Sequence, residues 1–272
     1  MNAASSNARY SALILAGQRG PEDPLASLSP EGHKCLLPIG GRPMIERVAA
    51  ALMASREIGA IAISIDRPAV LEKMAGFAQL VERGRVRVVE SAKTPATSVL
   101  DAIDELGEPY PLLVTTADHP LLSPGMLKTF IAASEAHDAA ITAGLVHESV
   151  VKAALPEAKR TYLRFRDGGY SGANLFLLRE SRALSAVSFW RQVESDRKRP
   201  WRIAKAFGPG LLLAYLLRVL TLDEAMKRIS ERLAAPARAV VLELAEAAVD
   251  VDKPGDIPVV EAFLNRRGGG PA

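Results

Sequence analysis

The chain has 272 residues, 49% hydrophobic and 24% charged, a composition typical of a folded globular protein. Its formal net charge of only +3 provides no general field that would draw it onto nucleic acid, so we expect no nucleic-acid partner. The single cysteine, Cys35, excludes a disulfide framework and a cysteine-based zinc cluster, and it favours a cytoplasmic protein. The polar first residues lack the apolar core of a signal peptide, so a flexible N-terminus is expected over 1–10.

Short apolar runs alternate along the chain with segments of helical period, which is typical of an α/β protein with a mostly parallel central sheet flanked by helices. Strands are expected at 11–16, 60–65, 85–90, 112–116, 139–145, 161–166, 173–178 and 239–244. Helices are expected at 44–55, 97–106 and 124–135, as a helical insertion over about 181–233, and after Pro254. The pattern predicts one Rossmann-like domain over 11–265, followed by a flexible tail over 266–272.

The first expected strand runs into a glycine loop, Leu15-Ala16-Gly17-Gln18-Arg19-Gly20, and Lys34 follows after a proline-rich stretch. Glycine lets the backbone approach a phosphate closely, and Arg19 and Lys34 supply positive charge, so a triphosphate would fit this loop. Many α/β proteins place glycine after their first strand for turn geometry alone, and that interpretation stays open. The loop lacks the pattern of a P-loop.

Three aspartates follow expected strands. Asp118 comes directly after the buried strand 112–116, and ligands bind at the carboxyl ends of strands in open α/β sheets. Asp250 and Asp252 alternate along an extended segment, so their side chains share a face that suits a cation. Such carboxylates could hold Mg²⁺. The alternative is that Asp118 and Asp252 cap the helices that follow them.

Taken together, these motifs resemble the MobA-like nucleotidyltransferase superfamily, which includes molybdenum cofactor guanylyltransferase and the methylerythritol- and inositol-phosphate cytidylyltransferases. The resemblance covers nearly the whole chain. It rests on Leu15-Ala16-Gly17, Lys34-Cys35-Leu36-Leu37-Pro38, Gly41-Arg42-Pro43, Asp118, and Asp250 to Asp256. The usual Gly-Gly-x-Ser-x-Arg-Met loop is replaced here by Gly17-Gln18-Arg19-Gly20, which puts the role of Arg19 in doubt.

The resemblance implies a Mg²⁺-dependent enzyme that transfers CMP or GMP from a nucleoside triphosphate to a phosphorylated small molecule. The acceptor's phosphate oxygen would attack the α-phosphorus in line, and pyrophosphate would leave. By this resemblance the catalytic residues are Lys34, Arg19 and Asp118, and the metal ligands are Asp118 with Asp250 or Asp252. The nucleotide would contact Leu15, Ala16, Gly17, Gln18, Lys34, Ser98 and Thr116. The acceptor would contact Gly172 and Asn174, in a loop over 170–174.

Two other functions stay open: a nucleotide-sugar-dependent glycosyltransferase of related fold, and a catalytically silent nucleotide-binding module. Lys34 and the early glycine loop argue against the glycosyltransferase. The presence of Lys34, Asp118 and Asp250 together argues against the silent module. A segment from Phe189 to Leu220 combines basic and aromatic residues with an apolar run, so it could rest on an anionic membrane surface. Alternatively it packs over the sheet or forms a homodimer contact.

Overall fold

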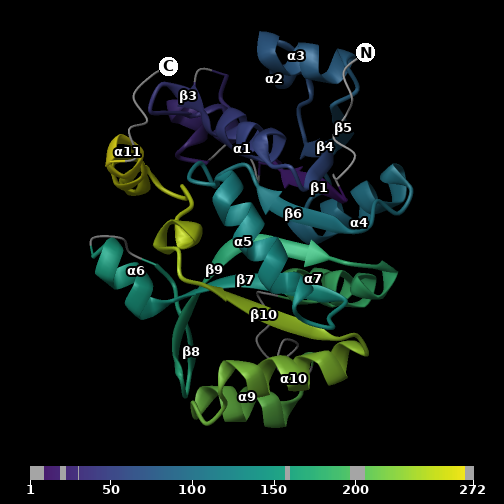
Figure 1. Cartoon of the computed structure of the whole chain (residues 1–272), viewed down its shortest axis with the longest axis vertical. Coiled ribbons are helices and arrows are strands. Elements are labelled where there is room, and N and C mark those ends of the chain that lie inside the picture. Colours follow the sequence, from purple (N-terminus) through teal and green to yellow (C-terminus); the bar gives the residue numbers. More distant parts are fainter. Residues whose placement is uncertain (1–8, 19–22, 30, 157–159, 197–205, 267–272) are drawn as a thin grey trace.

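An eight-stranded sheet forms the centre of the computed structural model, which describes residues 9–18, 23–29, 31–156, 160–196 and 206–266 (Figure 1). The strand order is β10-β7-β9-β6-β1-β4-β5, with β8 paired to β9. The strands are β1 (Tyr10–Leu15), β4 (Ile58–Ile65), β5 (Val86–Glu90), β6 (Leu112–Thr116), β7 (Ile141–His147), β8 (Leu163–Phe165), β9 (Gly168–Leu178) and β10 (Ala237–Leu242). A separate short hairpin pairs β2 (Pro38–Ile39) with β3 (Arg42–Pro43).

Most neighbouring strands of the large sheet run parallel. β5, β4, β1 and β6 are parallel in that order, as are β7 and β10, whereas β9 is antiparallel to both β6 and β7. Because β1 lies between two parallel neighbours and is covered on both faces, its side chains are apolar almost without interruption. The predicted α/β class with a mostly parallel sheet is confirmed.

Helices cover both faces of this sheet. Ala12 and Ile14 of β1 face the layer that contains α1 (Met44–Ala54) and α5 (Pro124–Glu135). Leu13, between them, faces α4 (Pro95–Leu106) and α7 (Leu184–Asp196). The alternation of side chains along a strand therefore divides the core into two layers.

The helix that begins beside the site is fixed by local sequence signals. Thr94 is the N-cap of α4, and its hydroxyl accepts a hydrogen bond from the backbone N–H of Thr97 at 3.3 Å. Pro95 occupies the first turn, where no N–H is needed, and Gly107 ends the helix with a φ of 71°. These signals hold the N-terminus of α4 at the carboxyl edge of the sheet.

Several predicted boundaries need correction. Three helices occupy segments that the sequence left unassigned: α2 (Ala69–Glu72), α3 (Ala75–Glu82) and α6 (Glu148–Ala154). The stretch 170–174, expected as a loop, belongs to the long strand β9, because β7 and β8 pair with the first half of that strand. Tyr10 and Arg266, assigned to flexible ends, belong to β1 and to α11 (Ile257–Arg266).

The expected helical segment after β9 contains α7, α9 (Pro209–Leu216) and α10 (Leu222–Leu233). α9 and α10 lie together at one end of the molecule (Figure 1). α9 exposes Leu213 and Leu216 at 58% and 66%, and Leu217, directly after it, is 64% exposed. The basic and aromatic residues within 197–205 lie outside the described residues.

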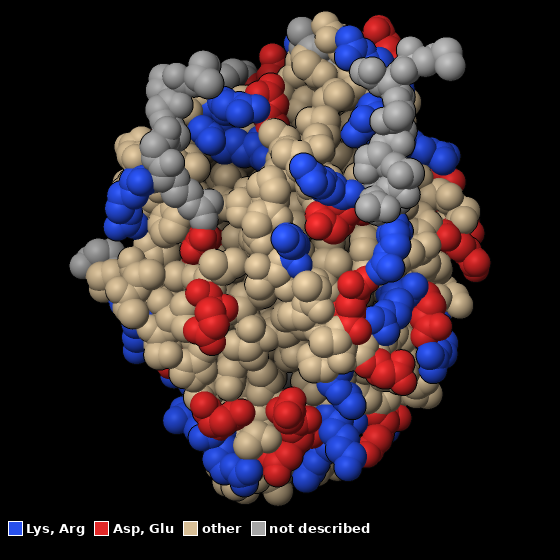
Figure 2. Space-filling model, in the orientation of Figure 1, with Lys and Arg blue, Asp and Glu red and all other residues tan. Residues whose placement is uncertain are grey.

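In the part of the chain that the structure describes, we find no helix with both the length and the apolar character needed to cross a membrane. Acidic and basic side chains are interspersed on the face drawn in Figure 2, in keeping with the small net charge.

Candidate active site

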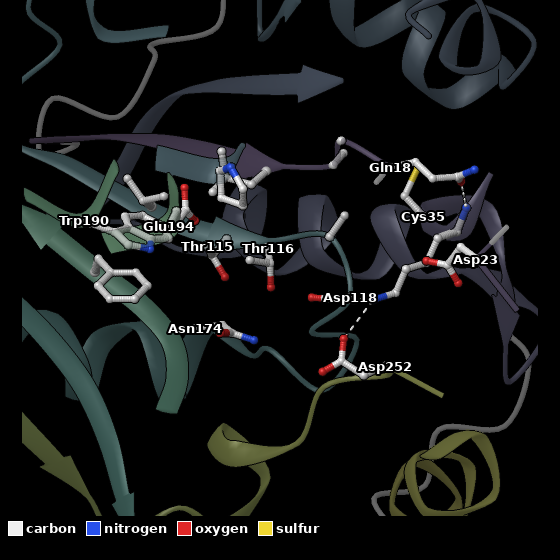
Figure 3. Close-up of a pocket in the computed structure, with 18 residues that line it drawn as sticks. Gln18, Asp23, Cys35, Thr115, Thr116, Asp118, Asn174, Trp190, Glu194 and Asp252 are labelled. Atoms are coloured by element: carbon white, nitrogen blue, oxygen red, sulfur yellow. Dashed lines mark hydrogen bonds and ion pairs between the residues drawn. The ribbon is translucent and has the colours of Figure 1, made fainter. Parts of the chain in front are cut away.

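A cavity of about 440 Å³ opens at the carboxyl ends of β1 and β6 (Figure 3). Such an edge is where open α/β sheets bind ligands. The lining combines a polar floor, a charged end and an aromatic end. It comprises Leu15, Ala16, Gly17, Gln18, Asp23, Lys34, Cys35, Pro95, Val114, Thr115, Thr116, Ala117, Asp118, Asn174, Phe176, Trp190, Glu194 and Asp252.

Lys34 joins two of the predicted aspartates at the charged end. Its Nζ donates to Oδ2 of Asp118 at 2.6 Å and to Oδ1 of Asp252 at 3.1 Å. The loop that carries Asp252 is held beside β6, because the N–H of Val251 donates to the carbonyl of Asp118 at 2.9 Å. Burial by itself lowers the pKa of Lys34, but attraction to the two carboxylates prevails and raises that pKa to about 12. Lys34 is therefore a cation throughout the physiological range.

A polar network that the sequence did not reveal holds Lys34 and the glycine loop in place. Asp66, directly after β4, accepts on Oδ1 from the backbone N–H of Gln18 at 2.9 Å and pairs there with Nε2 of His33 at 3.0 Å. His33 is completely buried, and its Nδ1 accepts from the N–H of Cys35 at 3.4 Å, so the Nε2–H tautomer donates to Asp66. The Gln18 side chain accepts from the N–H of Lys34 at 2.8 Å.

This network assigns a positioning role to Gln18. Both its backbone N–H and its side-chain oxygen have partners within the protein, rather than facing the cavity as groups reserved for phosphate. Although burial raises the pKa of Asp66, the hydrogen bonds from Gln18 and His33 outweigh burial and lower that pKa. Asp66 is thus an ionised anchor for the loop.

We expect Asp66→Ala to reduce the turnover of a triphosphate substrate by about 10- to 100-fold, because small displacements of catalytic groups carry costs of this size. Asp66→Asn, which keeps an acceptor oxygen, should retain most of the activity. The discriminating measurement is kcat in a Lys34→Met background, where Asp66→Ala should have a much smaller effect, because only its contact with the glycine loop then matters. An equally large loss of kcat in that background would mean that Asp66 does not act through Lys34.

The remaining predicted nucleotide contacts lie around the floor of the cavity. Leu15, Ala16 and Gly17 line it, and a Cβ at Gly17 would lie only 2.8 Å from Oγ of Ser91, so a larger residue there would force the Ser91 side chain to move. The hydroxyls of Thr115 and Thr116 are buried and find no hydrogen-bond partner among the described residues. These groups are suited to a polar ligand.

Two predicted site residues, Arg19 and Ser98, are not among the described residues that line the cavity. Arg19 lies outside the described residues. Ser98 is buried and does not line the cavity; its Oγ accepts from the N–H of Ala92 at 2.9 Å and so fixes the turn before α4. The geometry gives Ser98 a structural role instead of the predicted contact with the base.

The three predicted metal ligands do not form one cluster. Asp250 is turned toward Arg160, with which it pairs, and its Oδ2 accepts from Nδ2 of Asn174 at 3.0 Å. Burial raises the pKa of Asp250, and the neighbouring carboxylates of Asp252 and Asp118 raise it further. Within the described ranges, no group of three or more His, Cys, Asp or Glu side chains is placed to hold a metal ion. Of the three, Asp118 and Asp252 share a partner, because both accept from Nζ of Lys34.

The proposed capping role of Asp252 is wrong. The 3-10 turn η5 (Pro254–Asp256) is stabilised by Asp256, whose Oδ2 accepts from the N–H groups of Asp252 and Lys253, both at 3.0 Å. Because Asp256 satisfies these donors, the side chain of Asp252 is left to face Lys34.

A second cavity of about 290 Å³ adjoins the first, and Asn174 and Asp252 line both. The predicted acceptor residues Gly172 and Asn174 line the second cavity together with Arg160, Thr161, Ser171 and Asp250. The pairing of β9 with β7 shifts register at this point, and Asn174 has a φ of 48°. This local distortion accompanies the contact between the Asn174 amide and Asp250.

The aromatic end of the first cavity contains residues that the sequence did not assign to the site. Trp190 of α7 stacks on Phe176 of β9 with ring centroids 5.8 Å apart. Trp190 therefore packs over the sheet, as the alternative to a membrane contact predicted. The next turn of α7 places Glu194 beside it (Figure 3).

The family model of the MobA-like NTP transferase domain matches residues 12–194, which include the glycine loop, Lys34 and Asp118. The chain belongs to the MobA-like NTP transferase family. A solved structure of a hypothetical transferase from Thermus thermophilus is 31% identical to this family member, with a TM-score of 0.75 over 92% of this chain and 99% of that one. The predicted family is thereby confirmed.

Other relatives of this MobA-like chain are more distant. The 3-deoxy-manno-octulosonate cytidylyltransferases of two Synechococcus strains are 31% identical over 102 residues, which is 36% of this chain and only 38% of theirs. Two solved structures share the fold at 13% identity and a TM-score of 0.56, each over 96% of this chain and 100% of the other. They are a 4-diphosphocytidyl-2C-methyl-D-erythritol synthase from Anaerococcus prevotii and a CMP:2-keto-3-deoxy-manno-octonic acid synthetase complexed with CTP.

Proposed function

We propose that this chain is a Mg²⁺-dependent nucleotidyltransferase that moves a nucleoside monophosphate from a triphosphate to a phosphorylated small molecule, releasing pyrophosphate. The observation that carries the proposal is Lys34, held between Asp118 and Asp252 at the carboxyl edge of the sheet. A cation at this place reduces the repulsion between two phosphorylated reactants and stabilises the charge that develops on the transferred phosphoryl group. No covalent nucleophile is needed.

Cytidine triphosphate is the donor that we propose first, and guanosine triphosphate second. The curated relatives that match part of this chain are cytidylyltransferases, and one structure of the same fold is a complex with CTP. The phosphates would lie against Gly17 and Lys34, and the acceptor would enter the adjoining cavity that Gly172 and Asn174 line.

The residues present fit Mg²⁺. Oδ1 of Asp118 is buried and has no hydrogen-bond partner among the described residues, and Asp252 lies across Lys34 from it. Mg²⁺ is commonly held by one or two carboxylates together with substrate phosphates. We therefore propose Asp118 and Asp252 as the ligands. When bound, the ion would supply charge neutralisation at the phosphates; Lys34 would bind and orient them.

The test is thermal stabilisation by CTP, GTP, ATP and UTP, with and without Mg²⁺, for wild type, Asp118→Asn and the exposed control Asp138→Asn. A triphosphate at about a hundred times its Kd should stabilise the wild type by about 2.7 kcal/mol. We expect this stabilisation to require Mg²⁺ and to be lost only in Asp118→Asn. Stabilisation by a nucleotide diphosphate sugar instead would favour a glycosyltransferase, and no stabilisation at all would contradict these site assignments.

A membrane contact, a homodimer and a cytoplasmic location stay predictions. The exposed leucines Leu213, Leu216 and Leu217 form a surface that an anionic membrane or a second copy of this chain could cover. The cytoplasmic location is supported by the single, buried cysteine, Cys35.

A further inference from the structure

Trp190 and Glu194 lie at the end of the first cavity away from Asp118 and Asp252 (Figure 3), and Phe176 lines the same cavity. Trp190 and Glu194 lie four residues apart on α7, so their side chains share one face of that helix. The indole stacks on Phe176, with the two ring planes inclined by 26°. A flat aromatic wall with an acid beside it suits a nucleobase, which offers a π-face and a hydrogen-bonding edge.

Glu194 is fixed in this position by another element. Its Oε2 accepts from the backbone N–H of Ala96 at 3.2 Å, in the first turn of α4. A carboxylate at a helix N-terminus is also favoured by the helix dipole. The contact ties α7 to α4 and leaves the Glu194 carboxylate at the wall of the cavity rather than in solvent.

The two ends of the cavity fit opposite ends of a nucleotide. The cationic Lys34, with Asp118 and Asp252, suits phosphates and their metal, whereas Trp190 and Glu194 suit the base. An ionised carboxylate only accepts hydrogen bonds, so the base edge that meets it must donate. Cytosine, guanine and adenine each carry an exocyclic amine that donates. Uracil and hypoxanthine lack it: their ring N–H can still donate, but a carboxylate at the position of the cytosine or adenine amine would face a keto oxygen, which only accepts.

We propose that Glu194 recognises the exocyclic amine of the donor base, and so selects an amine-bearing nucleoside triphosphate over its keto counterpart. Glu194 is then a specificity-determining residue, with Oε2 held by the N–H of Ala96 and Oε1 left to accept from the base. This inference rests on the proposed nucleotidyl transfer and narrows its donor.

The test compares triphosphates that differ at the amine: CTP with UTP, and GTP and ATP with inosine triphosphate. Binding is measured by calorimetry in Mg²⁺ for wild type, Glu194→Gln and Asp101→Asn, an exposed control on α4. Glutamine keeps an oxygen for the N–H of Ala96, so Glu194→Gln should fold normally. In the pair that contains the donor, wild type and control should bind the amine-bearing triphosphate with a Kd about 10-fold or more lower than that of its keto counterpart. Glu194→Gln should lose most of this preference.

The possible results distinguish failure of the Glu194 proposal from failure of the proposed nucleotidyl transfer. Equal binding of both partners of each pair by the wild type would overturn the role of Glu194 and leave nucleotidyl transfer standing. Retention of the full preference by Glu194→Gln would overturn that role in the same way. If the wild type binds no triphosphate, the proposed function and this inference both fail. If the variant does not fold, the wild-type comparison decides between these outcomes.

Discussion

Lys34→Met should reduce the release of pyrophosphate by at least about 100-fold, which is the usual cost of removing one group that stabilises developing charge. In the wild type Lys34 lies 2.6 Å from Asp118 and 3.1 Å from Asp252, at the end of the cavity to which we assign the phosphates. Without this cation, the transferred phosphoryl group would approach two carboxylates with less compensating charge. Because the interaction strengthens in the transition state, kcat and kcat/KM should fall together.

The measurement is the rate of pyrophosphate release from whichever triphosphate stabilises the wild type, with a sugar phosphate or water as acceptor. Lys128→Met on α5 is the matched control, since Lys128 is exposed and does not line the cavity. The pKa of Lys34 is raised to about 12, so its protonation should not shape the rate between pH 6 and about 9. A Lys34→Met rate within about threefold of wild type would contradict the catalytic role.

Arg160→Met should destabilise the protein by about 3 to 5 kcal/mol, the cost of breaking a buried ion pair from one side. The Arg160 side chain is only 8% exposed, pairs with Asp250, and contacts Asp256 at 3.4 Å. Its Nη2 also donates to the carbonyl of Asp250 at 3.0 Å. Removing the guanidinium leaves the half-buried Asp250 and the buried Asp256 at the second cavity without their cation.

The free energy of unfolding in urea measures this effect, with the exposed Arg83→Met as control. The loss of stability in Arg160→Met should depend on pH. Burial already raises the pKa of Asp250 above its ordinary 3.8, and Arg160 opposes that rise. In Arg160→Met the folded-state pKa rises further, so the stability deficit should be largest at neutral pH and shrink as the pH falls toward about 4. A loss below about 1 kcal/mol would show that the pair is not needed for stability.

Sequence by itself determined the sheet, its direction and the charged end of the cavity. Apolar runs of strand length indicated buried strands, and the carboxyl ends of parallel neighbours meet at one edge. Gly17 after β1 and Asp118 after β6 could therefore be assigned to one edge of the sheet from sequence, and the structure shows that these two strands are direct neighbours. The capping signals of α4 are equally local, because N-cap and proline preferences act within one turn.

Only the tertiary structure decided how each aspartate is used and what completes the site. The partners that hold these side chains are far apart in sequence. His33 and Asp66 are separated by 33 residues, Arg160 and Asp250 by 90, and Ala96 and Glu194 by 98. No local pattern marks such partners, because burial and the packing of α7 on α4 create them. Alternation put Asp250 and Asp252 on one face, but the buried guanidinium of Arg160 binds the first and leaves the second to meet Lys34.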